Sequence, residues 1–212
     1  MSRPQRLWLV LGLNLVLVGL LVAVGRVSHS IAVFAEGVDY LADAAAIGVS
    51  LFAIWLSERP PNPSRPHGYP RATSHAALVN GGWLLVLSFL VAAGSVDRLV
   101  TGTPEVHGLP VLVVSGIAAV VMLIGVLVLG GDIDDPDDHG GNLNMRAVLL
   151  DTAADTAVAA AVAVTGAVIL ATQGLYWLDP TVALLVAAIV AYHAVKLLHR
   201  VMVVLRTPSP PL

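Results

Sequence analysis

The sequence predicts an all-α integral membrane protein, a bundle of six transmembrane helices with both termini in the cytoplasm. Hydrophobic residues make up 57% of the 212 residues and charged residues only 12%, whereas roughly a quarter of the residues in a typical soluble domain are charged. The mean hydropathy is +0.85. Long apolar runs, each close to the roughly 20 residues that cross a bilayer as a helix, recur along the chain.

Six apolar stretches are long enough to cross a bilayer. We expect the spans at about 7–25, 31–56, 72–99, 109–130, 143–172 and 181–204. The first stretch follows Arg3 and Arg6, as the apolar region of a signal peptide would. It is longer than such a region usually is, and no small-residue cleavage site follows it before Arg26, so we interpret it as a retained span.

Turn-forming residues separate the predicted spans. The proline pair at 60–61 ends the second span, and Thr-Gly-Thr-Pro at 101–104 ends the third, because proline cannot continue a helix. The glycine pair at 130–131 precedes a polar connector, and Trp-Leu-Asp-Pro at 177–180 turns the chain into the last span. The aromatic residues there are typical of a membrane interface.

The basic residues predict the orientation. With both termini in the cytoplasm, only Arg26 and Arg98 of the 11 basic residues lie outside. The other nine lie inside: Arg3, Arg6, Arg59, Arg65, Arg71, Arg146, Lys196, Arg200 and Arg206. This bias follows the positive-inside rule and requires an even number of spans. We therefore expect one six-helix transmembrane domain over residues 1–206, a short disordered tail at 207–212 and no soluble domain.

Acidic residues lie inside two of these spans. Asp39 and Asp43 are four residues apart, Asp151 and Asp155 repeat that spacing, and Glu36 comes three residues before Asp39. On an α-helix this spacing places the side chains on one face. A carboxylate at membrane depth costs roughly 2.5 to 3.5 kcal/mol on insertion scales. Two acidic faces on two helices therefore predict a cation between them.

Other interpretations of the aspartate pairs are less favourable. A pair with this spacing is usually a solvated helix face in a soluble protein, but lipid cannot solvate a carboxylate. Permanently protonated aspartates would need hydrogen-bond partners that the apolar spans do not offer. We expect four carboxylates to surround one small divalent cation and to take up protons when the cation leaves, because crowded carboxylates interact strongly with one another. Alternating occupancy by metal and protons defines a proton antiporter.

Several motifs occur in a fixed order along nearly the whole chain. They are residues 30–43 (SIAVFAEGVDYLAD), 59–61 (RPP), 67–72 (HGYPRA), 78–81 (LVNG), 144–155 (NMRAVLLDTAAD) and 177–180 (WLDP). In this succession the chain resembles the cation diffusion facilitator family. Because the resemblance extends over almost the entire sequence, it is far more specific than either aspartate pair alone.

The resemblance implies a six-helix domain, usually a homodimer, that exports divalent cations against protons by alternating access. The positions that match the family's tetrahedral transport site are Asp39 and Asp43 on the second span and Asp151 and Asp155 on the fifth. Most members continue into a cytoplasmic metal-binding domain. We expect that domain to be absent because the sequence stops at Leu212, so that a homodimer would form through the transmembrane helices.

The chain departs from the family pattern in its ligand chemistry. Many zinc-transporting members have histidine where Asp39 and Asp151 stand, so the predicted site has only oxygen ligands, and the chain has no cysteine. Oxygen ligands favour Mn²⁺, although carboxylates also bind Zn²⁺ and Fe²⁺. We expect one of these three ions as the transported cation, with a preference for Mn²⁺, and no prosthetic group. The family often has histidine and glutamate where Arg65 and Thr73 stand, which argues against a secondary cation site.

Two further acidic features each have a structural interpretation and a functional one. Glu36 is either an outer-shell proton relay or a hydrogen-bond partner in helix packing. The connector between the fourth and fifth spans is either a solvated loop or a cytoplasmic funnel that concentrates cations. Its polar residues are Asp132, Asp134, Asp135, Asp137, Asp138 and His139.

The favoured function is a secondary transporter, not an enzyme, whose partners are a divalent metal ion, protons and the lipid bilayer. We expect no nucleic-acid partner and a multi-pass location in a prokaryotic inner membrane. One alternative is a non-transporting metal-binding subunit of a larger relative, suggested by the absent cytoplasmic domain. Another is an intramembrane aspartyl protease, which also uses two aspartates. That class expects one aspartate on each of two helices, whereas here they come in pairs.

Overall fold

The computed structural model describes residues 3–57, 72–131 and 142–206, which form six helices and no strand. The helices are α1 (Arg3–Val27), α2 (Ile31–Ser57), α3 (Ala72–Thr101), α4 (Gly108–Gly131), α5 (Asn142–Thr172) and α6 (Leu178–Arg206). The prediction of an all-α bundle of six helices is confirmed.

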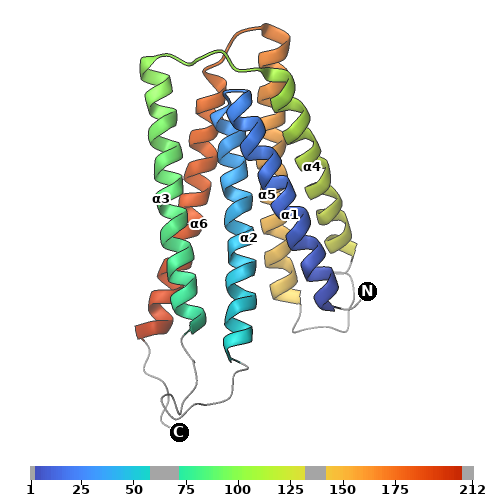
Figure 1. Cartoon of the computed structure of the whole chain (residues 1–212), viewed down its shortest axis with the longest axis vertical. Coiled ribbons are helices and arrows are strands. Elements are labelled where there is room, and N and C mark those ends of the chain that lie inside the picture. The colour runs from blue at the N-terminus through green and yellow to red at the C-terminus, as the bar shows by residue number, and fades with distance from the viewer. Residues whose placement is uncertain (1–2, 58–71, 132–141, 207–212) are drawn as a thin grey trace.

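The helices run along the long axis of the bundle (Figure 1). α3 lies beside α6, α4 beside α5, and α1 beside α2, while α2 also packs against α3 and α6. The start of α1 and the end of α6 lie at the same end of the bundle, as an even number of spans requires. We call the opposite end the upper end, as it is drawn in Figure 1; it contains residues 28–30, 102–107 and 173–177.

The three connections at the upper end are short because single residues reverse the chain. His29, between α1 and α2, has a φ of 57°, and Gln173, after α5, has a φ of 49°. Gly102 ends α3 with a φ of 112°, and its amide donates a hydrogen bond to the Arg98 carbonyl at 3.1 Å. Left-handed residues of this kind commonly terminate helices.

Small residues allow α4 and α5 to approach closely. A Cβ added at Gly108 would lie 2.6 Å from the Gly166 carbonyl oxygen and from the Leu170 amide, and one added at Gly166 would lie 2.6 Å from the Leu112 amide. Glycine at both positions is therefore a packing requirement. Small residues at helix contacts are typical of membrane bundles.

The surface of the bundle is apolar enough to face lipid. α3 to α6 each contain a segment long and apolar enough to cross a membrane: Ala77–Thr101, Gly108–Leu127, Thr152–Thr172 and Leu178–Val203. Leu15–Val27 is a shorter apolar segment. Large apolar side chains such as Val79, Phe89 and Leu127 are exposed on this surface, which in water would be an aggregation liability. The chain is a multi-pass integral membrane protein.

Candidate metal-transport site

The acidic face of α2 lies toward the interior of the bundle. Glu36 is 1% exposed and Tyr40, one turn later, is 3% exposed. Asp39 and Asp43 are half-buried. The periodicity of the helix thus brings three carboxylates and a phenol onto adjoining positions of α2, well inside its apolar stretch.

Asp155 of α5 interacts electrostatically with a residue of α2. The Tyr40 side chain interacts electrostatically with the carboxylates of Glu36, Asp39 and Asp43 on its own helix, and with that of Asp155 on α5. Asp155 is itself half-buried. Asp155 on α5 is therefore within electrostatic range of Tyr40 on α2.

The described side chains of the predicted ligand set do not form a complete metal-binding site. Asp39, Asp43 and Asp155 each take part in a polar or electrostatic interaction. Among the side chains that the structure describes, no three histidines or acidic residues converge closely enough to hold a metal ion. The side chain of Asp151, one turn before Asp155 on α5, lies outside that described set.

Glu36 connects α2 to α4 through one of its two oxygens. The Ser115 hydroxyl donates a hydrogen bond to Glu36 Oε2 at 2.6 Å, and Ser115 is fully buried. Within the described residues, Glu36 Oε1 and the Tyr40 hydroxyl are buried without any hydrogen-bond partner. Buried polar atoms in this condition are rare in native proteins, and here two of them occur one turn apart beside the aspartates.

The chemistry of these residues suits a hard or borderline cation. Tyr40 and the carboxylates that interact with it electrostatically all offer oxygen: those of Glu36, Asp39, Asp43 and Asp155. Oxygen ligands suit divalent ions such as Mn²⁺ and also bind Zn²⁺. A mobile divalent ion or protons would compensate negative charge that lipid cannot solvate.

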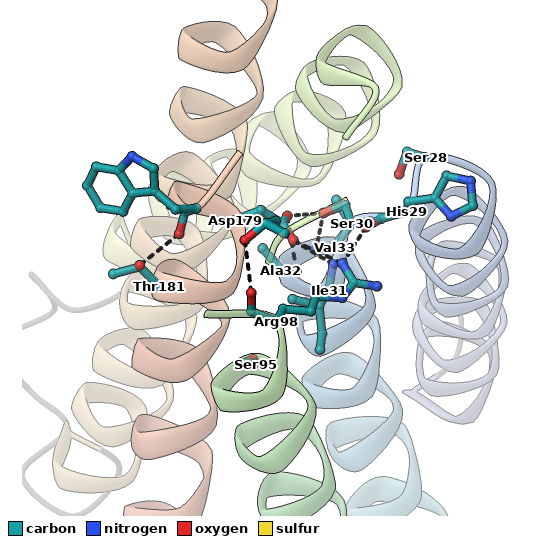
Figure 2. A network of polar contacts seen from close by, with 12 residues as sticks. Ser28, His29, Ser30, Ile31, Ala32, Val33, Ser95, Arg98, Asp179 and Thr181 are labelled. Carbon is teal, nitrogen blue, oxygen red and sulfur yellow. Dashed lines mark hydrogen bonds and ion pairs between the residues drawn. The ribbon is translucent and has the colours of Figure 1, made fainter. Parts of the chain in front are cut away.

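A second buried carboxylate lies at the upper end, and Figure 2 shows its surroundings. Asp179, in the first turn of α6, is 0% exposed. It accepts hydrogen bonds from the amide of Ile31 at 2.7 Å, from the amide of Ala32 at 3.3 Å and from the Ser30 hydroxyl. Arg98 Nη1 of α3 lies 3.7 Å from Asp179 Oδ2. Asp179 therefore caps the start of α2 from a different helix. We call this cluster of Ser30, Ile31, Ala32, Arg98 and Asp179 the Asp179 junction.

Two further bonds complete the junction. The Val33 amide donates to the Ser30 hydroxyl at 3.1 Å, the usual bond of an N-cap serine. Arg98 Nη1 donates to the His29 carbonyl. α2, α3, α6 and the turn before α2 thus meet in one polar cluster.

The sequence reasoning did not identify Asp179 as the centre of such a cluster. The residue belongs to the Trp-Leu-Asp-Pro motif, and an acid in the first turn of a helix is an ordinary start signal. Asp179 caps a helix that starts 148 residues earlier, and no local pattern indicates that pairing. The predicted cation-funnel residues 132–139 lie outside the described residues.

The sequence was compared with known proteins and protein families. The family model described as the cation efflux transmembrane domain matches residues 7–205. A "Zinc transporter ZitB" of Yersinia pestis is 31% identical over 176 residues, which are 82% of this chain and 54% of that protein.

Two other relatives are similar at lower identity. The "Proton-coupled zinc antiporter SLC30A2" of Homo sapiens is 27% identical over 191 residues, 88% of this chain and 51% of its own length. The "Cadmium, cobalt and zinc/H(+)-K(+) antiporter" of Bacillus subtilis (strain 168) is 28% identical over 168 residues, 78% of this chain and 51% of its own length. The chain spans about half the length of the curated relatives it matches.

Proposed function

The chain belongs to the cation efflux family, whose members are also called cation diffusion facilitators, and we propose that it exports a divalent metal cation in exchange for protons. The observation that supports the proposal is that Tyr40 of α2 lies within electrostatic range of Asp39 and Asp43 on its own helix and of Asp155 on α5. Acidic faces on two helices of an apolar bundle are stabilised when a cation or protons compensate their negative charge. A transporter, and not an enzyme, follows from the family.

We assign the transported ion to Asp39, Asp43, Asp151 and Asp155. The first two and the last are supported by their electrostatic interaction with Tyr40, and Asp151 by its place one helical turn before Asp155. Glu36 is proposed as an outer-shell proton acceptor beside this set. Its support is the Oε1 atom that is buried without a hydrogen-bond partner among the described residues.

Two arguments bear on the identity of the ion. The names of the relatives all include zinc, which supports Zn²⁺ as a substrate. The ligand set contains only carboxylates, which extends the expected range to Mn²⁺ and Fe²⁺. Measuring uptake of Zn²⁺ in the presence of increasing Mn²⁺ decides between them. If Mn²⁺ in large excess does not slow Zn²⁺ uptake, the carboxylate argument for Mn²⁺ is wrong.

We further propose that both termini face the cytoplasm of a prokaryotic cell and that the chain forms a homodimer through its helices. The orientation is supported by the nine basic residues that it places inside. Accessibility of single cysteines introduced near each terminus would test the orientation in a chain that has no cysteine of its own. The mass of the purified protein in detergent, corrected for bound detergent, would test the dimer.

The transport proposal is tested with the protein alone in lipid vesicles. We expect metal flux that follows an imposed pH difference and falls when a proton ionophore collapses that difference. Flux that does not respond to the ionophore would contradict proton coupling. Complete absence of flux, with folded protein in the vesicles, would favour the non-transporting subunit instead.

The site assignment needs its own variants. We expect Asp43→Ala and Asp155→Ala each to reduce flux to the level of empty vesicles, because each removes a charged ligand. Asp97→Ala is the matched control, since Asp97 is an exposed carboxylate near the end of α3, and its flux should remain near that of the unmodified protein. Retained flux in both site variants would remove the assignment.

A further inference from the structure

Two histidines from different connections lie next to each other at the upper end of the bundle. His29 lies in the turn between α1 and α2, and His107 directly precedes α4. Their imidazole rings are tilted by 34° to each other, with ring centres 6.0 Å apart. Both side chains are exposed, so ions in solution can reach them. The transport site proposed above includes neither residue.

Backbone hydrogen bonds hold the two histidines side by side. The His107 amide donates to the Ser28 carbonyl at 3.0 Å, so the chain before α4 is bonded to the residue that precedes His29. Arg98 Nη1 donates to the His29 carbonyl. None of these bonds uses an imidazole nitrogen, and Figure 2 shows the His29 ring pointing away from Asp179. The rings are therefore positioned by the fold without taking part in the Asp179 junction.

The separation of the rings suits a single metal ion between them. A Zn²⁺–N bond of about 2.0–2.1 Å places the ion about 3.2 Å from the centre of a coordinated imidazole ring. Two rings on one ion then have centres about 5.2 Å apart at a tetrahedral angle and about 6.4 Å apart on opposite sides of the ion. The 6.0 Å between His29 and His107 lies within this range. Packing of rings without metal covers a similar range, roughly 4.5–7 Å, and is the alternative explanation of the contact.

Open pockets beside both rings leave room for an ion with its water ligands. His107 lines a pocket of about 280 Å³ with Glu105, and His29 lines one of about 370 Å³ with Arg26 and Arg98. A cation therefore approaches the pair more favourably from the side of the carboxylate than from the side of the two guanidinium groups. Among the described side chains no third histidine or acid converges with the pair, so water completes the coordination.

We propose that His29 and His107 form a second metal site, separate from the aspartates, for a divalent ion that prefers nitrogen ligands: Zn²⁺, Cu²⁺ or Ni²⁺. Imidazole suits these ions, whereas oxygen ligands suit Mn²⁺. The site lies at the upper end, opposite the start of α1 and the end of α6 (Figure 1). In the orientation proposed above, this side receives the exported ions. The inference concerns binding at equilibrium and does not depend on transport.

Electron paramagnetic resonance with Cu²⁺ identifies the ligands. Among the divalent ions of its row Cu²⁺ binds most tightly, and electron spin-echo modulation detects the remote nitrogen of each coordinated imidazole. The protein is used without a histidine tag and with Asp43→Ala and Asp155→Ala, so that these two carboxylates do not compete for the ion. At one Cu²⁺ per chain we expect two coordinated imidazoles.

Variants of the pair decide whether these imidazoles belong to His29 and His107. His29→Asn and His107→Gln should each remove one coordinated imidazole, and the double variant should lose both. A spectrum without imidazole nitrogen before these substitutions would mean that the rings are only in packing contact, and would overturn the proposal. A spectrum unchanged in both single variants would place the copper at other histidines, with the same consequence.

The two substitutions are chosen to keep the fold. His29 has a φ of 57°, a left-handed conformation that asparagine tolerates better than most residues do. The bond from residue 107 to Ser28 uses a backbone amide, which glutamine retains. We therefore expect melting temperatures without metal within about 2 °C of the unsubstituted protein. His199→Gln is the matched control, because it removes another exposed histidine, on α6, and should leave the copper spectrum unchanged.

Calorimetric titration with Ni²⁺ measures the affinity in the same Asp43→Ala and Asp155→Ala protein. We expect the affinity of one Ni²⁺ site to fall at least about tenfold in His29→Asn and in His107→Gln, because each loses one of two nitrogen ligands. Glu105→Gln should weaken binding only about twofold, since this exposed carboxylate contributes charge without being a ligand. An affinity for Mn²⁺ equal to that for Ni²⁺, or one that neither histidine variant lowers, would contradict a nitrogen site.

Discussion

Two buried carboxylates of this protein have opposite surroundings. Asp179 at the upper end accepts hydrogen bonds from two amides and a hydroxyl and pairs with Arg98. Glu36, deeper in the bundle, accepts one hydrogen bond from Ser115, and its other oxygen has no partner in the described part of the chain. Both side chains are almost completely shielded from solvent, at 0% and 1% exposure.

The difference in hydrogen bonding distinguishes a carboxylate with a structural role from one that has an oxygen available to bind a proton or a cation. Burial of a charge is tolerated when its hydrogen-bonding capacity is filled, as at Asp179. An unfilled oxygen costs free energy that helix packing alone does not recover. Such an atom persists where something absent from the protein chain itself, such as a proton, a water molecule or a cation, can occupy the place beside it.

The comparison predicts the largest loss of stability at the Asp179 junction. Asp179→Ala removes every contact of this carboxylate and leaves Arg98 and the first amides of α2 without their acceptor. We expect the free energy of unfolding to fall by about 3 kcal/mol, measured by thermal or denaturant unfolding in detergent. A loss below that of Ser115→Ala would show that the junction is not the stronger of the two clusters.

Glu36→Gln should separate stability from function. The amide oxygen can still accept the Ser115 hydrogen bond, so we expect the free energy of unfolding to change by less than about 1 kcal/mol. Flux should nevertheless fall about tenfold, because glutamine cannot accept a proton at this position. Flux equal to that of the unmodified protein would assign Glu36 to helix packing only, and the contrast with Asp179 would lose its functional meaning.

Ser115→Ala removes the side-chain hydrogen bond that joins Ser115 of α4 to Glu36 of α2. We expect a loss of about 1 kcal/mol in the free energy of unfolding, less than for Asp179→Ala. The same unfolding assay measures it. Stability losses of equal size in the two variants would mean that the number of hydrogen bonds to each carboxylate does not determine its contribution to stability.

Tyr40→Phe removes a buried hydroxyl that has no hydrogen-bond partner in the described residues. Since no bond is lost, we expect the free energy of unfolding to stay within about 0.5 kcal/mol or to rise. A loss above 1 kcal/mol would mean that the hydroxyl has a partner when the protein is in a membrane. Reduced flux at unchanged stability would show that Tyr40, like Glu36, takes part in transport.

The smallest effect is expected at Asp97. This carboxylate is exposed, one residue from Arg98 and outside the Asp179 junction. Asp97→Asn should change stability by less than about 0.5 kcal/mol and leave flux unaltered. A larger change would show that net charge at the upper end, and not the specific contacts of Asp179, is responsible for the effects predicted above.

Much of the candidate site could be predicted from local spacing. The i, i+4 pairs and Glu36 share faces because a helix repeats every 3.6 residues, and the apolar sequence around them implied that these faces were inside a membrane bundle. Spacing could not show that Glu36 meets Ser115, which is 79 residues away, nor that one of its oxygens is left without a partner in the described residues.

By itself, the sequence determined the membrane location, the six helices, the acidic faces of the second and fifth helices and the family, because composition, helical period and motif order are all local properties. Only the tertiary structure decided that Asp179 caps a helix from 148 residues away, that α2 packs more against α3 and α6 than against α5, and that Glu36 lies against α4. The physical reason is that apolar helices are nearly interchangeable as neighbours in lipid, so small residues and a few polar contacts select the partners.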